Sequence, residues 1–392
     1  MDYMIVDVET TIRNNKVGKH KASAFCPDNK IVLLGYTDGD AVITTTSSYA
    51  FSSRLKEVNL LVGHNIKFDL HHIWMDNPHS REWFDKGRIW DTQLAEYILS
   101  GQSCLYPSLD DCSAKYGGTL KDDKIKTYWN AGMDTTEIPI EELEEYLMWD
   151  VKNTETVFMA QWERATELGM LDLILFQMEA LLATTEMEFN GMSFDVAKAD
   201  ELSKPIQAEI EKLTYELKNI MIRCGIDEPN VLSNDHLSLL LYGGDYRYIS
   251  DEPVIGEDGE PVRYKTGLKA GQIKTKKTPM TAPMDGLGIV PRKEWAVKKK
   301  GFYRVNDECL SAIITDLIAG DPSLTFTIKL ETVEKILKLR GLNKDYSTYY
   351  KGYSDLTWEW DGKIHHNLNH CATATGRLSS TSPNLQNTSS VK

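Results

Sequence analysis

The stretch Tyr3-Met-Ile-Val-Asp7-Val-Glu9-Thr-Thr11 opens the chain and decides how its first domain is interpreted. The mostly apolar run from Tyr3 predicts a buried β-strand. Asp7 and Glu9 are two residues apart, so their side chains leave the same face of that strand. Two carboxylates on one face repel each other, and a divalent cation with oxygen ligands, Mg²⁺ or Mn²⁺, offsets that repulsion. The alternative is a solvated pair of acids at a strand end, and the rest of the chain has to decide between the two.

The composition is that of a globular protein. With 392 residues, 41% hydrophobic and 26% charged, the chain is long enough for two or three domains. No apolar run approaches the length of a membrane span, and the N-terminus shows no signal-peptide pattern. The six cysteines include no C-x-x-C pair, which argues against a zinc site and a disulfide framework. These features predict a cytoplasmic protein without a membrane partner.

The charge is unevenly distributed along the chain. A net charge of −14 is unfavourable for a nucleic-acid partner, but residues 263–304 carry twelve Lys and Arg and only two acids, Asp285 and Glu294. An acidic protein can bind DNA through such a basic segment. The net charge therefore does not exclude a nucleic-acid partner.

The first 165 residues alternate strand-like and helical runs, which predicts an α/β domain. The expected strands are the opening stretch and residues 30–36, 41–45 and 59–63. The expected helices begin after His64, at a cap formed by Asp91 or Thr92, and at Pro139. Tyr146 and Asp150 are four residues apart in the last of these helices and therefore share one face of it.

The following residues are mainly helical, with one long interruption. Residues 165–227 show a helical pattern that a turn at Asn190-Gly191 interrupts. Residues 243–304 lose this periodicity and are rich in Gly, Pro and Lys, which predicts a long flexible insertion with a hairpin at 254–262. Helical character then returns from 306 to 350.

Strand-like character marks the end of the chain. Leu356–Trp360 predicts a strand, Asp361-Gly362 a turn, and Lys363–His366 a second strand. A polar run rich in Thr, Ser and Asn follows to Lys392.

Four acids and one tyrosine of the first domain form a candidate metal site: Asp7, Glu9, Asp69, Asp150 and Tyr146. The strands and helices that carry them can converge at one edge of an α/β sheet. Four carboxylates can hold two Mg²⁺ ions roughly 4 Å apart, the arrangement used in the hydrolysis of phosphodiesters. A tyrosine with an ordinary pKa is too weak a base to deprotonate water, so Tyr146 is expected to orient the attacking water by a hydrogen bond.

The order and spacing of these residues resemble the motifs of a known enzyme superfamily. The three motifs are Asp7-x-Glu9, Asn65-x-x-x-Asp69 and Tyr146-x-x-x-Asp150. They resemble those of the four-carboxylate 3′–5′ exonucleases in the variant that carries a tyrosine. Asp91-Thr92 and the helix after it resemble the helix between the second and third motifs of proofreading domains.

This resemblance implies a ribonuclease-H-like α/β fold for residues 1–165, with the four acids as ligands of two divalent cations. It also implies that Asn65 and Phe68 bind the 3′-terminal nucleotide of a DNA strand, by hydrogen bonding and stacking respectively, although each can be purely structural. Three nearby histidines are expected to pack or hydrogen-bond rather than bind metal: His64, His71 and His72.

The last part of the chain resembles a second family. Residues 371–387 resemble, almost letter for letter, the segment that precedes the catalytic aspartate of family A DNA polymerases, the bacterial DNA polymerase I type. Weaker matches at 186–195, 336–342 and 362–365 resemble the beginning of the polymerase region, the end of the thumb and the strand entering the palm. The resemblance implies a mainly helical thumb at 166–355, with the basic insertion at about 243–304, and the start of an α+β palm at 356–392.

The same resemblance implies contacts with primer–template DNA. Arg377 can bond acceptors in the minor groove, and neutral polar side chains can donate to phosphates and base edges. The predicted contacts are Thr375, Arg377, Ser379, Ser380, Asn384, Gln386 and Asn387. The basic residues 263–304 are expected to bind duplex phosphates rather than dock a processivity factor, because no apolar docking pattern accompanies their charges.

The polymerase motifs expected after residue 387 do not occur before Lys392. The sequence therefore predicts a 3′–5′ proofreading exonuclease, the N-terminal portion of a split or truncated phage-type family A polymerase that acts in DNA replication in the host cytoplasm. No polymerase activity is expected of this chain alone. The alternative is a DNA-binding subunit that completes a polymerase with a separate C-terminal chain. An RNA-trimming nuclease would use the same acids but does not account for the thumb and palm resemblance.

Overall fold

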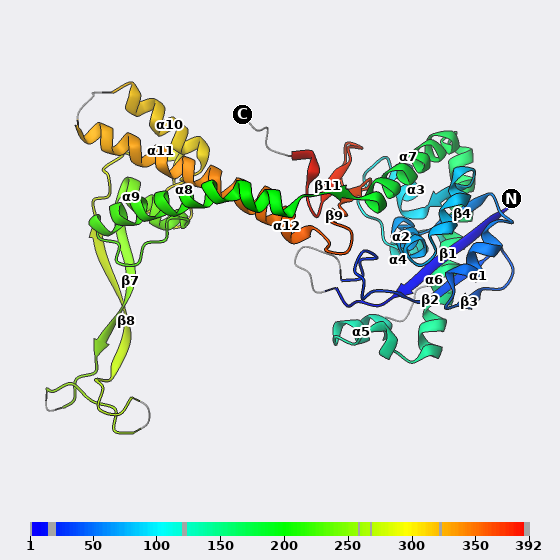
Figure 1. The fold of residues 1–392 in the computed structure, drawn as a ribbon, viewed down its shortest axis with the longest axis horizontal. Helices are drawn as coiled ribbons and strands as arrows, with labels where there is room; N and C mark the ends of the chain where they lie inside the picture. Colours follow the sequence, from blue (N-terminus) through cyan, green and yellow to red (C-terminus); the bar gives the residue numbers. More distant parts are fainter. Residues whose placement is uncertain are drawn as a thin grey trace. The chain divides into compact units, whose positions relative to one another are not determined.

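The computed structural model describes residues 2–14, 21–119, 124–257, 259–266, 269–320 and 324–387 (Figure 1). The chain forms two compact units. The first unit comprises residues 1–198 and 351–392, and the second comprises residues 199–350.

A five-stranded sheet forms the centre of the first unit. Its strands are β1 (Tyr3–Thr10), β2 (Ile31–Thr37), β3 (Ile43–Thr45), β4 (Leu60–Gly63) and β5 (Arg88–Asp91). They lie in the order β3-β2-β1-β4-β5, so β1 occupies the middle. β1, β2 and β3 pair antiparallel, whereas β4 and β5 run parallel to β1. The predicted meander and α/β organisation are confirmed.

The central strand is buried because its apolar run faces neighbouring elements on both sides. Met4, Ile5 and Val6 are at most 1% exposed and belong to the main hydrophobic core of this unit. A near-continuous apolar run is typical of a strand that is covered on both faces. The same burial brings the polar residues that follow, Asp7 and Glu9, to the edge of the core.

Seven helices surround or extend this sheet in the described part of the first 190 residues. Their bounds are α1 (Ser48–Leu55), α2 (Lys67–Asp76), α3 (Thr92–Leu99), α4 (Leu109–Tyr116), α5 (Lys124–Asn130), α6 (Ile140–Glu167) and α7 (Leu171–Asn190). Short 3-10 turns span Pro78–Asp85 and Thr135–Glu137. The predicted helix after Pro139 is confirmed as α6, which contacts β1 and β2.

A glycine in β2 permits the close approach of α6 to the sheet. A Cβ atom at Gly35 would lie 2.9 Å from Leu147 Cγ and 3.0 Å from Val151 Cγ2, both in α6. The first distance is shorter than real Cβ contacts and the second is very tight, so a larger residue would force α6 side chains or the helix itself to shift. Gly35 pairs with Asp7 across the two strands, and the approach therefore occurs beside the acids.

The C-terminal residues of the first unit add one helix and two small sheets. α12 (Lys351–Leu356) is followed by β9 (Lys363–Ile364), which pairs with β6 (Met192–Ser193). β10 (Asn367–Asn369) pairs antiparallel with β11 (Ser379–Thr381), and a 3-10 turn spans Leu385–Asn387.

The predicted strand at 356–360 is wrong. α12 ends at Leu356, and the residues after it form a turn in which Trp358 N donates to Lys363 O and Gly362 N donates to Trp358 O. The alternating tryptophans that suggested a strand are explained by their tertiary contacts with Phe25. Trp358 is buried beside Phe25, and the Trp360 indole donates to Phe25 O at 3.0 Å.

The second unit has its own core and an extended two-stranded ribbon. Its helices are α8 (Val196–Arg223, which begins in the first unit), α9 (Asn234–Tyr242), α10 (Asp307–Ile318) and α11 (Leu324–Asp345). A short 3-10 turn at Lys293–Trp295 precedes α10, and a π-helical turn at Tyr346–Tyr350 follows α11. The helices expected before and after the insertion are confirmed.

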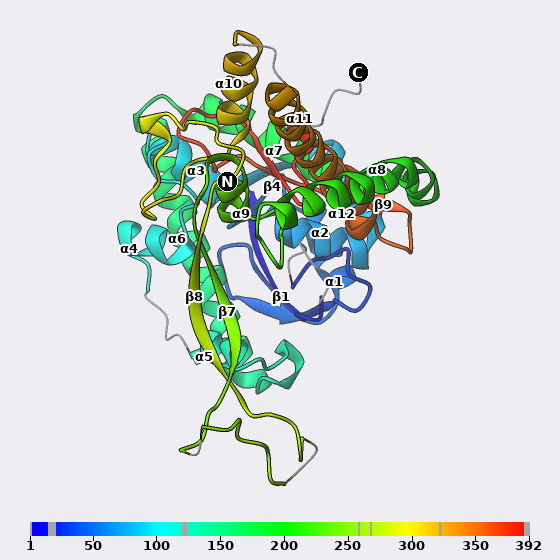
Figure 2. The same ribbon diagram turned by 90° about the vertical axis from the view of Figure 1, so that its left-hand side faces the viewer.

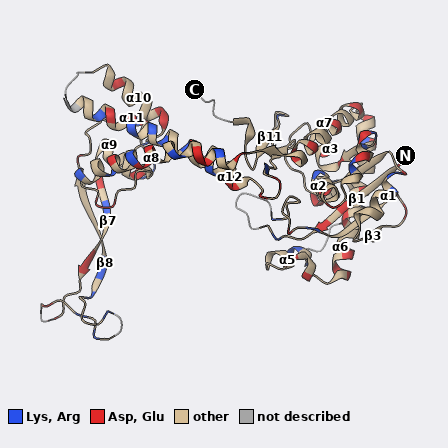
Figure 3. Cartoon of the chain, in the orientation of Figure 1, with Lys and Arg blue, Asp and Glu red and all other residues tan. Residues whose placement is uncertain are grey.

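The insertion contains more regular structure than the sequence predicts. β7 (Gly244–Pro253) and β8 (Thr275–Met284) pair antiparallel over their full ten residues (Figure 2). The predicted hairpin at 254–262 forms the outer continuation of this ribbon, where Val262 N donates to Val254 O at 2.8 Å. Acidic and basic residues lie together on the ribbon (Figure 3), and Lys277 pairs in register with Asp251.

No helix among the described residues has both the length and the apolar character that a membrane crossing requires.

Candidate active site

Three of the four predicted metal ligands lie together. One carboxylate oxygen each from Asp7, Glu9 and Asp150 lies within 4.8 Å of the other two. Glu9 is 7% exposed and Asp150 is 6% exposed, whereas Asp7 is half-buried. Asp7 and Glu9 come from one face of β1, and Asp150 reaches them from α6 because that helix passes close over Gly35. The convergence expected from the spacing is therefore present.

The fourth acid, Asp69, lies beside this cluster in the first turn of α2. It is 2% exposed, and its Oδ1 accepts a hydrogen bond of 3.0 Å from the backbone N–H of Val8, the residue between Asp7 and Glu9. Burial and, secondarily, the negative charge of Asp7 raise the pKa of Asp69. A cation placed beside Asp69 and Asp7 would offset this repulsion between their negative charges.

The tyrosine of the third motif lies one helical turn before Asp150 on α6. Tyr146 is half-buried, and its ring packs edge-on against Trp129 with 5.9 Å between the ring centroids. This packing holds the ring at the side of the helix that also carries Asp150. The expected shared face is confirmed, and the role of the hydroxyl stays a prediction.

Asp91 holds the turn that presents Asn65. Asn65 has a φ of +56°, in the left-handed region that asparagine tolerates better than most residues. The N–H groups of Asn65 and Ile66 donate to the two oxygens of Asp91, each at 3.1 Å. The same carboxylate caps α3, where Gln93 N and Leu94 N donate to it at 2.8 and 3.2 Å. The predicted cap is confirmed, but its second role was missed because the two partners are 26 residues apart in sequence.

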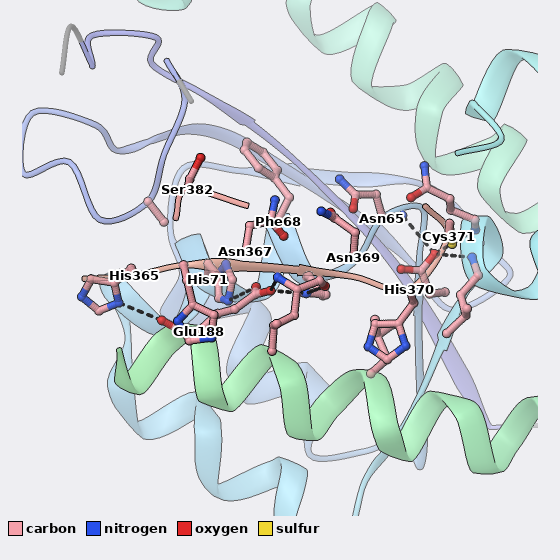
Figure 4. A pocket seen from close by; sticks show the side chains of 18 of the residues that line it. Asn65, Phe68, His71, Glu188, His365, Asn367, Asn369, His370, Cys371 and Ser382 are labelled. Carbon is pink, nitrogen blue, oxygen red and sulfur yellow. Dashed lines mark hydrogen bonds and ion pairs between the residues drawn. The ribbon is translucent and has the colours of Figure 1, made fainter. Parts of the chain in front are cut away.

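Asn65 and Phe68 line a cavity of about 280 Å³ within the first unit. β10 forms the facing wall with Asn367, Leu368 and Asn369. Figure 4 shows Asn65 and Phe68 on one side of this strand and Glu188 of α7 on the other. The cavity therefore joins the second exonuclease-like motif to the segment that resembles a polymerase palm.

The three histidines near the acids have structural partners, as expected. His64 Nδ1 lies 2.9 Å from Thr92 Oγ1, His72 Nε2 lies 2.8 Å from Ala22 O, and His71 Nε2 lies 3.2 Å from Thr185 O. None of the three belongs to the acidic cluster among the described residues.

The residues predicted to contact primer–template DNA lie on and around β11. Ser380 is 2% exposed, and its hydroxyl donates to Pro383 O and accepts from Leu385 N, both at 3.1 Å. Ser379 is half-buried. The other five are exposed: Thr375, Arg377, Asn384, Gln386 and Asn387. Their contacts with DNA stay predictions.

A buried ion pair next to the cavity was missed by the sequence reasoning. Lys67 Nζ donates to Glu188 Oε1 and, at 2.6 Å, to Leu368 O. A lysine between Asn65 and Asp69, in an otherwise apolar helix face, is the only signal that could have pointed to it. Its partners lie 121 and 301 residues away in sequence, so no local pattern reveals them.

Comparison with known proteins finds a family match for the last part of the chain and weaker similarity over most of it. Residues 286–392 match the family described as DNA polymerase family A. DNA polymerase I of Bacillus subtilis is 23% identical over 335 residues, which cover 80% of this chain and 30% of that protein. The thermostable DNA polymerase I of Thermus aquaticus is 54% identical over 55 residues, 14% of this chain and 7% of that protein.

A solved structure shows the same fold. The POL domain of Pol1 from M. smegmatis, in complex with DNA primer-template and dNTP, has a TM-score of 0.62 at 17% identity and covers 98% of this chain and 52% of that chain. The chain is therefore similar to the DNA polymerases of family A, with the family match confined to residues 286–392. It spans about a third or less of the length of these curated relatives.

Proposed function

We propose that the first unit is a 3′–5′ DNA exonuclease with a ribonuclease-H-like fold, which proofreads as part of a family A polymerase. The observation that carries this proposal is the convergence of Asp7, Glu9 and Asp150 within 4.8 Å, with Asp69 bonded to the strand between the first two. The relatives named DNA polymerase I support a DNA substrate.

The four carboxylates are suitable ligands for hard divalent cations. All four side chains offer carboxylate oxygens, which Mg²⁺ and Mn²⁺ prefer, and neither histidine nor cysteine belongs to the described cluster. Asp7, Glu9, Asp69 and Asp150 would hold the cations. When bound, two such ions lower the pKa of a water molecule and stabilise negative charge on the departing 3′ oxygen.

The chain's own residues would position the reactants. Tyr146, one turn from Asp150, would form a hydrogen bond with the attacking water and so fix the direction from which the water attacks. Asn65 would hydrogen-bond to the terminal nucleotide, and Phe68 would stack on its base, since both line one cavity and flank the start of the helix that carries Asp69. The buried setting of Glu9 and Asp150 keeps bulk water from screening their charges.

Removal of the strand's two acids tests this proposal. Asp7→Ala with Glu9→Ala should lower the rate of degradation of a 5′-labelled single-stranded DNA by more than about a hundredfold in Mg²⁺, while DNA binding persists. The matched control is Asp172→Ala with Glu179→Ala, which removes two exposed acids of α7. Undiminished degradation by the first variant would refute the assignment.

The second unit and residues 351–392 are proposed to bind primer–template DNA, as thumb and the first part of a palm. The family match over residues 286–392 and the fold shared with a polymerase–DNA complex support this part of the proposal. A separate chain that supplies the remaining polymerase motifs is the proposed partner. Co-expression with such a chain should yield a complex that synthesises DNA, whereas failure to associate would count against it.

A further inference from the structure

We propose that Lys67 and Glu188 are positioning residues of this exonuclease. Their buried ion pair fixes β10 opposite Asn65 and Phe68, so that the nucleotides behind the 3′ end are held between α2 and β10. The inference rests on the proposed function and deepens it, because it names the part of the chain that holds the strand upstream of the scissile bond.

The pair binds both backbone polar groups of one residue of β10, Leu368. Lys67 Nζ donates to Leu368 O at 2.6 Å, and Glu188 Oε1 accepts from Leu368 N as well as from Lys67. Lys67 is 8% exposed and Glu188 is 2% exposed. His71 Nε2 lies 3.5 Å from the other oxygen of Glu188. Both hydrogen-bonding groups of Leu368 are therefore bound by charged side chains from outside its own strand.

The position of Lys67 connects these contacts with β10 to the acidic site. Lys67 lies between Asn65 and Asp69 at the start of α2, and Glu188 lies in the last turn of α7. Any displacement of β10 relative to α2 has to break a hydrogen bond made by a buried charge, which is costly. The width of the cavity between Asn65 and Asn369 is consequently fixed by residues that do not contact the reacting atoms.

A purely structural ion pair would behave differently. Buried ion pairs are often replaceable by neutral side chains without loss of stability. A positioning role predicts that the defect depends on substrate length. It is larger for a strand that runs along β10 than for a substrate of one nucleotide, which offers β10 fewer contacts.

The test compares two substrates in three variants. Lys67→Met removes the ammonium group, and Lys67→Met with Glu188→Gln removes both charges, so that a folded protein is obtained even if a lone buried Glu188 is not tolerated. Lys115→Met is the matched control, because Lys115 pairs with the buried Glu96 away from β10. The substrates are a single-stranded octadeoxynucleotide and the p-nitrophenyl ester of thymidine 5′-monophosphate.

In both Lys67 variants, kcat/KM for the octanucleotide should fall about 10- to 100-fold, the scale of a misplaced substrate. The value for the ester should fall at least about fivefold less, and the control should change neither value. Equal losses on both substrates, or no loss on either, overturn the proposal.

Hydrogen exchange tests whether the ion pair holds β10 in place, and it does not require an activity measurement. The amides of 367–381 should exchange faster in Lys67→Met than in the wild type, and they should be unchanged in Lys115→Met. Unchanged exchange in Lys67→Met overturns the inference. A wild-type protein inactive on both substrates would instead refute the proposed function, and exchange would still decide whether the pair anchors β10.

Discussion

Replacing Asp150 by asparagine should make the metal-free protein more stable while it destroys the proposed site. Asp150, Glu9 and Asp7 bring carboxylate oxygens within 4.8 Å of one another, and two of the three side chains are buried. Two unit charges 4.8 Å apart interact by about 3.5 kcal/mol at an effective dielectric constant of about 20. Asparagine keeps the shape of the side chain and removes the charge.

The net gain is smaller than the full interaction, because Asp7 is half-exposed and its charge is screened. About 2 kcal/mol is a realistic stabilisation, which corresponds to a rise in Tm of roughly 4–8 °C for a unit of this size. The exposed Asp172→Asn, an identical chemical change on α7, should alter the free energy of unfolding by less than about 0.5 kcal/mol.

The assay is thermal unfolding followed in EDTA and in excess Mg²⁺. In EDTA the Asp150→Asn variant should unfold at a higher temperature than the wild type. Mg²⁺ should then raise the Tm of the wild type more than that of the variant, because the variant has lost a ligand. If Asp150→Asn is no more stable than the wild type in EDTA, the three carboxylates do not repel one another and the electrostatic reasoning is refuted.

Three further outcomes are expected from the contacts described above. Asp91→Ala should lower the free energy of unfolding in urea by about 3–5 kcal/mol, since Asp91 accepts from four backbone N–H groups; a loss below about 1 kcal/mol would contradict this. Burial lowers the pKa of His370 from 6.5 to about 4, so the unfolded chain takes up the proton first and stability falls as the pH drops from 6.5 towards about 4. His370→Gln should reduce the slope of the free energy of unfolding against pH by up to about 1.4 kcal/mol per pH unit. Unfolding measured from pH 7 to 4 can detect this change, and an unchanged slope would show that another group is responsible. Lys298→Ala with Lys300→Ala should reduce the slope of log Kd for duplex DNA against log salt concentration by about 2, as expected if both bind phosphates, whereas an identical slope would exclude them.

The sequence was sufficient where the decisive pattern is local. The apolar run before Asp7 and the helical periodicity around Asp150 predicted β1 and α6, and these two elements bring three of the predicted ligands together. The contact of Lys67 with Glu188 and Leu368 could not be predicted, because it joins three segments far apart in sequence.

The wrong predictions have equally physical causes. The alternating tryptophans near Trp358 reflect packing against Phe25, a tertiary effect that imitates a strand pattern. β8 was missed because it contains Pro279 and Pro283, which argue against a strand in the middle of a sheet but are tolerated at the edge of a two-stranded ribbon.

The close passage of α6 over Gly35 has a consequence for the choice of ion. Mg²⁺ requires ligand distances of about 2.0–2.1 Å, whereas Ca²⁺ accepts about 2.3–2.6 Å. Because Gly35 lies opposite Asp7 and beneath Leu147 and Val151, a methyl group there would move Asp150 away from β1. Gly35→Ala would then widen the cluster and favour the larger ion. The absence of a side chain at residue 35 would therefore determine which ionic radius the carboxylates fit.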